Sequence, residues 1–161
     1  MTLTLLNRLP LHDARAKLLE CGGSAEWADR LLALRPFPNQ EHLFTRAEEI
    51  WWNLDESAWL DAFSRHPQIG AREALSTWSS EEQAGMNHAS VATALDLHDL
   101  NRDYLQKFGW TFIICATGKS AEEMHSALVR RLGNGGPDEI RVAAAEQAKI
   151  MRIRLRKLVE L

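Results

Sequence analysis

The apolar residues of this chain recur with the period of an α-helix along almost its whole length, and this pattern limits the fold more than any other feature. Residues 13–21 end at a Gly-Gly pair, and residues 25–35 follow Ser24, a typical N-cap residue. Asn39 and Asp55 open two more periodic stretches in the same way. The first part of the chain is therefore predicted to be helical.

The rest of the chain continues the pattern. A long periodic stretch covers residues 79–108, and we expect an interruption near residues 97–99 because so long a helix is uncommon. Ser120 is expected to cap a helix over residues 122–132, and Pro137 suits the first turn of a last helix that runs to the end. Together these stretches predict an all-α fold.

Residues 110–116, with the sequence WTFIICA, form the one convincing β-like run. A single strand has no ladder partner, so its backbone N–H and C=O groups must bond elsewhere. One interpretation is a segment whose backbone binds a small, amide-rich ligand. The other is a buried connection between helices or a short edge strand, and the pattern alone favours it. Either way, the sequence predicts one extended, non-helical segment in an otherwise helical protein.

Composition limits the class of protein. The 161 residues are 45% hydrophobic and 25% charged, as in average globular proteins, so we expect residues 1–161 to form a single domain. A net charge of −3 and a pI of 6.1 do not suit a nucleic-acid-binding protein. The apolar runs are too short for a signal peptide or a membrane span, and the two cysteines lie far apart, which suits a cytoplasmic protein.

His66 begins the stretch HPQIG, where the preceding helical pattern stops. Pro67 disfavours helical backbone at His66 and so places the ring at a fixed corner. A favourable interaction with the helix dipole is the simplest explanation for a histidine at this position. Because histidine also exchanges a proton near neutral pH, His66 is a candidate catalytic residue.

Ser79 and Glu82 have the spacing of a capping box, which explains both residues without any function. A carboxylate in a first helical turn also lies near free backbone N–H groups, which keep it ionised and able to accept hydrogen bonds from a ligand. Gln83 adds an amide donor and an acceptor. The sequence leaves both interpretations of this stretch open.

Arg154 lies next to Leu155, between the apolar stripe and the solvated face of the predicted last helix. A guanidinium held against a core can bind a carboxylate through two parallel hydrogen bonds. A basic, solvated helix face is the simpler explanation, so Arg154 is a candidate only.

Four motifs occur in a fixed order: HPQIG, S-x-x-E-Q, FGWTFIICATGKS and the C-terminal KI-x-x-x-RL. Together they resemble the 2-oxo-4-hydroxy-4-carboxy-5-ureidoimidazoline (OHCU) decarboxylases, over most of the chain from residue 39 to the end. The resemblance implies an all-α, single-domain enzyme without a cofactor, usually a homodimer. It also implies the last step of urate degradation, the conversion of OHCU, a small-molecule substrate, to (S)-allantoin.

The resemblance implies a set of site residues as well. His66 would be the catalytic histidine and Glu82 the essential carboxylate. Arg154 would be the family's C-terminal arginine, with Arg152 as the alternative. The residues implied to bind the substrate are Pro67, Ser79, Gln83, Phe112, Ile113, Ile114, Cys115 and Ala116. We expect His66 to supply the proton that replaces carbon dioxide, Glu82 to bind N–H groups, and Arg154 to stabilise negative charge.

The chain departs from the family pattern in two places. Thr111 stands where many members have a proline, which affects the path of the extended segment. The connection between HPQIG and S-x-x-E-Q is also shorter than in many relatives, which affects the width of the pocket.

Two other classes of protein fit parts of the sequence. A small helical interaction module would use the tryptophan-rich middle of the chain as its partner surface, but it does not explain an extended segment beside polar groups. A metal-dependent hydrolase would use His66, Glu82 and His88, although no helical i, i+4 histidine pair is present and alternating charge explains the nearby acidic residues. No metal is therefore predicted.

Overall fold

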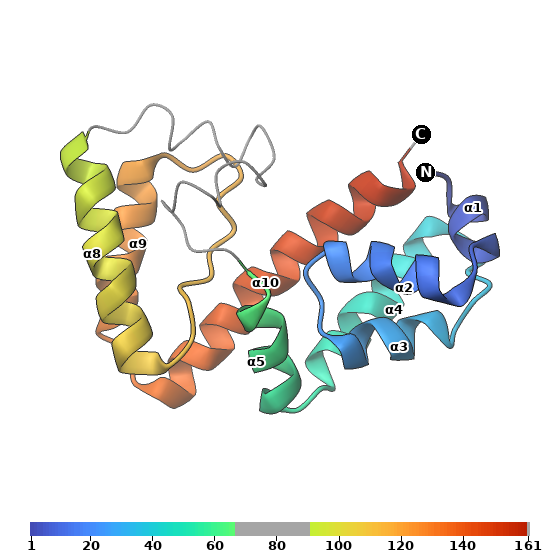
Figure 1. Cartoon of the computed structure of the whole chain (residues 1–161), viewed down its shortest axis with the longest axis horizontal. Helices are drawn as coiled ribbons and strands as arrows, with labels where there is room; N and C mark the ends of the chain where they lie inside the picture. The colour runs from blue at the N-terminus through green and yellow to red at the C-terminus, as the bar shows by residue number, and fades with distance from the viewer. Residues whose placement is uncertain (67–90, 161) are drawn as a thin grey trace. The chain divides into compact units, whose positions relative to one another are not determined.

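A computed structural model describes residues 1–66 and 91–160. Every regular element in those ranges is an α-helix, which confirms the all-α prediction (Figure 1). The chain divides into two compact units, Met1–Arg65 with Gln147–Leu161, and His66–Glu146. We call them the first and the second unit. None of the described helices has the length and apolar character needed to cross a bilayer.

The first unit is built from five short helices and the C-terminal part of a long one. They are α1 (Leu3–Arg8), α2 (Leu11–Glu20), α3 (Ala25–Leu32), α4 (Gln40–Trp52), α5 (Glu56–Ser64) and the part of α10 (Gly136–Val159) from residue 147 onward. The predicted N-caps are confirmed, because Ser24, Asn39 and Asp55 each accept a hydrogen bond from a backbone N–H three residues later. Helix α1 was not predicted, and α2 begins two residues earlier than expected.

Tryptophans dominate the core of the first unit. Trp27 and Trp51 are fully buried and Trp59 is nearly so. The indole N–H of Trp27 donates to the carbonyl of Ala47, and that of Trp59 to the carbonyl of Trp51, each at 2.9 Å. Burying a large ring while bonding its polar N–H is the favourable use of tryptophan in a core. These three residues are therefore not a partner surface.

Two large apolar residues of this region are exposed. Leu60 is 39% exposed, because the buried stripe of α5 consists of Ala58, Trp59, Ala62 and Phe63. Leu60 lies beside that stripe. Trp52, at the end of α4, is 40% exposed although its neighbour Trp51 is fully buried.

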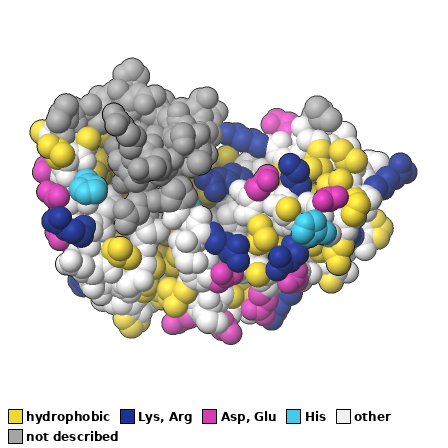
Figure 2. All heavy atoms as spheres, in the orientation of Figure 1, with side chains coloured by type: hydrophobic (Ala, Val, Ile, Leu, Met, Phe, Trp, Pro, Cys, Tyr) yellow, Lys and Arg dark blue, Asp and Glu magenta, His cyan; other side chains and the backbone are white. Residues whose placement is uncertain are grey.

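Charged side chains of opposite sign lie close together on the face shown in Figure 2. The first unit has exposed ion pairs, among them Arg15–Asp29 at 2.8 Å, Arg30–Glu26 at 2.6 Å and Arg46–Glu49 at 2.5 Å. Exposed pairs of this kind contribute at most about 1 kcal/mol each to stability. The apolar core, not these pairs, stabilises the unit.

The second unit contains α8 (Val91–Phe108), α9 (Ala121–Leu132) and the first part of α10. Helix α8 is continuous through residues 97–99, so the prediction of an interruption there is wrong. Leu97 is fully buried, and its packing stabilises the helix at this point. Helices α8 and α9 pack against each other. Both run from top to bottom in Figure 1, and residues 109–120 return along them to the start of α9.

Candidate active site

His66 follows the last turn of α5, whose position is well fixed. The carboxylate of Asp61 accepts the backbone N–H of Ala25 at 3.0 Å, which ties α5 to the first turn of α3. The helix ends at Ser64 with Arg65 as its C-cap, and the His66 side chain is half-buried, with its Nε2 atom shielded from solvent. His66 therefore lies just beyond the C-terminal end of an anchored helix, near the negative end of the helix dipole.

Several of the predicted residues lie outside the described ranges: Pro67, Ser79, Glu82, Gln83 and His88. Their part in a site stays a prediction. Within residues 1–66 and 91–160, no group of three His, Cys, Asp or Glu side chains is placed to hold a metal ion. Two of the acidic residues lie near basic side chains. Asp96 Oδ2 is 3.9 Å from His125 Nε2, and Asp99 Oδ1 is 3.7 Å from Arg102 Nη2.

Residues 112–116 are non-helical and all buried, as the sequence predicts for this segment. Alternate side chains, those of Phe112, Ile114 and Ala116, pack into one apolar cluster with residues of α8 and α9, whereas Ile113 and Cys115 are buried outside it. Side chains that alternate with a period of two indicate an extended backbone. The cluster of α8 and α9 thus holds this segment in an extended path.

Charged side chains bond the backbone of the extended segment on one edge. The carbonyl of Ile113 accepts a hydrogen bond from Arg131 Nη1 at 2.6 Å. The N–H of Cys115 donates to Glu146 Oε1 at 3.2 Å, and its carbonyl accepts from Lys119 Nζ at 2.8 Å. These bonds take the place of the ladder partner that a lone strand lacks.

Ile114 differs from its two neighbours. The described residues place no hydrogen-bond partner on its backbone N–H or C=O, although Ile114 is only 3% exposed. Buried backbone groups are paired in the great majority of cases, with protein, water or ligand. Ile114 therefore has one donor and one acceptor available to a small molecule.

Thr111, which stands in place of the proline of many family members, precedes the buried segment. Its hydroxyl oxygen is shielded from solvent and has no hydrogen-bond partner among the described residues. Residues 112–116, which follow Thr111, are non-helical and buried, and the effect of Thr111 on the path of the segment stays a prediction.

Arg154 is half-buried on α10, whereas Arg152 is exposed and lies 3.5 Å from Glu48. A Cβ atom added to Gly22 would lie 3.4 Å from Arg154 Nη1, so the guanidinium lies against the turn that follows α2. The neighbouring Cys21 is buried as well. Burial raises the pKa of the Cys21 thiol to about 12, an effect that the Arg154 cation opposes and the Glu20 carboxylate reinforces.

The structure assigns the predicted residues to different units. His66 and residues 112–116 belong to the second unit, and Arg154 belongs to the first. That His66, the extended segment and Arg154 contribute to one site stays a prediction.

Sequence reasoning missed a buried polar network in the second unit. Arg131 and Glu139 form an ion pair at 2.7 Å, with side chains 6% and 0% exposed. Glu139 also accepts a hydrogen bond from the hydroxyl of Tyr104, whose pKa is raised by burial and by that bond. A signal was present in the sequence, because Arg131 continues the apolar stripe of Met124 and Leu128 at helical spacing.

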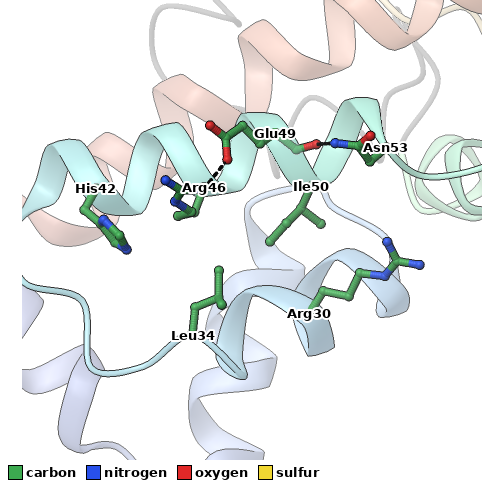
Figure 3. A pocket seen from close by; sticks show the side chains of 7 residues that line it. All are labelled: Arg30, Leu34, His42, Arg46, Glu49, Ile50 and Asn53. Carbon is green, nitrogen blue, oxygen red and sulfur yellow. Dashed lines mark hydrogen bonds and ion pairs between the residues drawn. The ribbon is translucent and has the colours of Figure 1, made fainter.

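A groove on the first unit lies between α3 and α4 and has a volume of about 430 Å³ (Figure 3). It is lined by Arg30, Leu34, His42, Arg46, Glu49, Ile50 and Asn53. Both arginines are neutralised, Arg46 by Glu49 and Arg30 by Glu26. None of the predicted site residues lines this groove, and we assign it no function.

Comparison with known proteins identifies the family. The OHCU decarboxylase family model matches residues 7–156. A uric acid degradation bifunctional protein TTL of Arabidopsis thaliana is 38% identical over 146 residues, which are 86% of this chain and 45% of that protein. The chain therefore spans less than half the length of that bifunctional relative. The 2-oxo-4-hydroxy-4-carboxy-5-ureidoimidazoline decarboxylase of Amia calva is 31% identical over 132 residues, which are 78% of this chain and 75% of that one.

A solved structure has the same fold. It is a crystal structure of an OHCU decarboxylase in the presence of (S)-allantoin, 34% identical in sequence, with a TM-score of 0.81. The similarity covers 91% of this chain and 99% of that one. Together with the family match over residues 7–156, it shows that this chain belongs to the OHCU decarboxylase family, as the four sequence motifs predict.

Proposed function

We propose that this chain catalyses the decarboxylation of OHCU to (S)-allantoin, with residues 1–161 acting as one domain. Family membership supports this proposal most strongly, because the match over residues 7–156 includes residues of both compact units. The related structure determined in the presence of (S)-allantoin supports the choice of ligand.

The reaction needs a proton donor at a defined place. The bond between the ring carbon and the carboxylate breaks, carbon dioxide leaves, and the electron pair moves into the adjacent electron-poor C=N or C=O system. A proton must then reach one face of that system, because the product has one handedness. In our proposal His66 supplies it, since an imidazole is present in both protonation states near neutral pH.

Glu82 and Arg154 complete the charged part of the proposed site. Glu82 accepts hydrogen bonds from the ring or ureido N–H groups, and Arg154 stabilises the negative charge that moves toward the ring. The half-buried position of Arg154, compared with the exposed Arg152, supports the choice between the two arginines.

The backbone of the extended segment supplies the uncharged hydrogen-bonding groups of the proposed site. Of its central residues, Ile113 and Cys115 already bond Arg131, Glu146 and Lys119 through their backbones. We therefore assign substrate binding to the backbone of Ile114, whose N–H and C=O complement the C=O and N–H of a ureido group. The other residues of the segment from Phe112 to Ala116 stay in the proposed substrate-binding set, as the resemblance implies.

The family resemblance supports the remaining parts of the proposal. The protein acts without a cofactor on a small-molecule substrate, as a cytoplasmic homodimer that binds neither nucleic acid nor membrane. Sedimentation velocity at micromolar concentration is the direct test of the homodimer.

Circular dichroism during enzymatic oxidation of urate tests the proposed activity. Without a catalyst, the proton would add equally to both faces of the planar intermediate and give racemic allantoin, so a growing optical signal requires a stereospecific catalyst. Added wild-type protein should speed the appearance of dichroic (S)-allantoin in proportion to its concentration. A signal no larger than in the protein-free reaction contradicts the proposed function.

A further inference from the structure

We propose that Arg131 and Glu139 are positioning residues for the decarboxylation. Their buried ion pair fixes the carbonyl of Ile113 and thereby sets the direction in which Ile114 offers its backbone N–H and C=O to the substrate. This inference rests on the proposed function, and it adds two residues of α9 and α10 that do not touch the substrate.

The carboxylate of Glu139 is held from several sides. Arg131 Nε and Nη2 lie 2.9 and 2.7 Å from Glu139 Oε2. The hydroxyl of Tyr104 donates to the same oxygen, and Asn134 Nδ2 donates to Oε1 at 3.0 Å. With its side chain fully buried, Glu139 has no room for another rotamer that keeps these bonds. It therefore fixes the plane of the Arg131 guanidinium.

The guanidinium in turn holds the extended segment at two consecutive residues. Nη1, the nitrogen that does not bond Glu139, donates to the carbonyl of Ile113 at 2.6 Å. The guanidinium carbon also lies 4.4 Å from the centre of the Phe112 ring, a cation–π contact. A rotation of the backbone at residues 112–113 would break both contacts, so the ion pair determines the orientation of this peptide.

Stability alone does not explain an ion pair at this place. Replacing a buried ion pair by apolar side chains of similar volume is often neutral or stabilising, because the two charges lose their hydration. An apolar pair, however, cannot donate a hydrogen bond to the Ile113 carbonyl. The feature that distinguishes Arg131 from an apolar residue here is control of the backbone.

The backbone geometry of an extended chain explains how the Arg131–Ile113 hydrogen bond affects the substrate. Backbone groups of successive residues point to opposite edges of an extended segment. Since Ile113 and Cys115 bond Arg131 and Glu146 on one edge, the N–H and C=O of Ile114 face the other edge. Turning the Ile113 peptide would turn Ile114 away from a bound ureido or ring amide, and small misplacements of this kind can lower rates a hundredfold.

Two conservative variants test the inference. Arg131→Lys keeps the charge but cannot bond both Glu139 and Ile113, and Glu139→Gln keeps the shape but removes the charge. Arg130→Lys, at an exposed neighbouring position of α9, is the matched control. Isothermal titration with (S)-allantoin, well below the melting temperature of each variant, measures binding to the folded protein. Steady-state kinetics then separates KM from kcat.

We expect the affinity for (S)-allantoin and kcat/KM to fall about tenfold or more in both variants, the size of one lost hydrogen bond to the ligand. The control should keep the wild-type values. A purely structural role would lower the melting temperature and leave the affinity of the folded protein unchanged, and that result overturns the inference. If the wild-type protein itself neither decarboxylates OHCU nor binds (S)-allantoin, the proposed function fails instead.

Amide hydrogen exchange of the wild-type protein gives a test that needs no variant. The Cys115 N–H, which bonds Glu146, should exchange slowly with or without ligand. The Ile114 N–H should slow about tenfold or more only when (S)-allantoin is bound. An Ile114 amide whose exchange does not respond to saturating (S)-allantoin overturns the inference even if both variants fail to fold.

Discussion

The side-chain amide of Gln147 donates a hydrogen bond of 2.6 Å to the carbonyl of Gly22, a residue 125 positions earlier in the chain. Gly22 adopts a φ of +97°, a backbone conformation that residues other than glycine rarely adopt. The bond therefore joins α10 to a turn that only glycine forms easily, beside Arg154.

Gly22→Ala should destabilise the protein by more than backbone strain alone. The positive φ costs roughly 1–2 kcal/mol for a residue with a Cβ. The new Cβ would also lie 2.6 Å from Gln147 Nε2, so this side chain must shift, whereas its distance of 3.4 Å from Arg154 Nη1 is an ordinary contact. Thermal unfolding measures the loss, at about 2–4 °C per kcal/mol for a chain of this size.

Gly118→Ala is the matched control for this variant. Gly118 also has a positive φ, of +76°, but a Cβ there would meet no atom within 4 Å. Its melting temperature should therefore fall by the strain alone and its turnover should stay at the wild-type level. Equal losses in the two variants would show that the contacts of Gly22 with Gln147 and Arg154 have no energetic effect.

His66→Asn should reduce turnover of OHCU while the fold stays intact. Removing a general acid typically lowers the rate by ~10²–10⁴. Asparagine keeps polarity and approximate size, so the circular dichroism spectrum and melting temperature should change little. His12→Asn, at an exposed position on α2, controls for the loss of a histidine. A His66→Asn protein with wild-type turnover would remove His66 from the mechanism.

Ser24→Ala should weaken the first unit through its N-cap. The hydroxyl of Ser24 accepts the backbone N–H of Trp27 at 3.1 Å, and Ser24 is fully buried, so water cannot replace the lost bond. The expected loss is about 1–2 kcal/mol in the free energy of unfolding, measured as a lower urea midpoint at an unchanged slope. Ser120→Ala removes a less buried cap of the same type, and it should cost less.

Most helices could be predicted because their signals are local. Ser24, Asn39, Asp55 and Ser120 are polar residues immediately before apolar periodic stretches, and each caps a helix as expected. Helix α1 was missed because its six residues are too few to establish a period. The partners of the extended segment could not be predicted, since Arg131 lies 18 residues from Ile113 and Glu146 lies 31 residues from Cys115.

For the candidate site, too, the local motifs could be predicted and the long-range contacts could not. The four motifs predict the family, and the family match confirms it, whereas the roles of the individual site residues stay a prediction. Which backbone groups of residues 112–116 are already bonded depends on side chains of α9 and α10, which no spacing rule connects to the segment. For that reason the resemblance implies substrate binding equally for Ile113, Ile114 and Cys115, whereas in the structure only Ile114 of these three has both its backbone N–H and C=O without a hydrogen-bond partner among the described residues.

Alkaline pH should destabilise the wild-type protein earlier than a Cys21→Ala variant. The pKa of Cys21 is about 12 in the folded protein and about 9 in an unfolded chain, mainly because of burial. The folded state thus keeps a proton that the unfolded state loses, so the free energy of unfolding falls as pH rises above 9. For one group the slope reaches about 1.4 kcal/mol per pH unit.

The comparison is clearest between pH 9 and 10. The raised pKa of Tyr104 adds a second loss only above the ordinary tyrosine value of about 10. Urea unfolding at pH 8, 9 and 10 should therefore show a steeper decline for wild type than for Cys21→Ala. If the free energy of unfolding fell equally with pH in the two proteins, folding would not raise the pKa of Cys21.

The burial of Arg131 against Glu139 also constrains how this sequence can evolve. Removing one partner of a buried pair costs about 3–5 kcal/mol, because the remaining charge has no counter-charge, and domains of this kind have only about 5–15 kcal/mol of stability in total. A lineage that changes either codon alone therefore passes through a poorly folded intermediate. Relatives should keep both residues or replace both together, so that the two alignment columns vary as one.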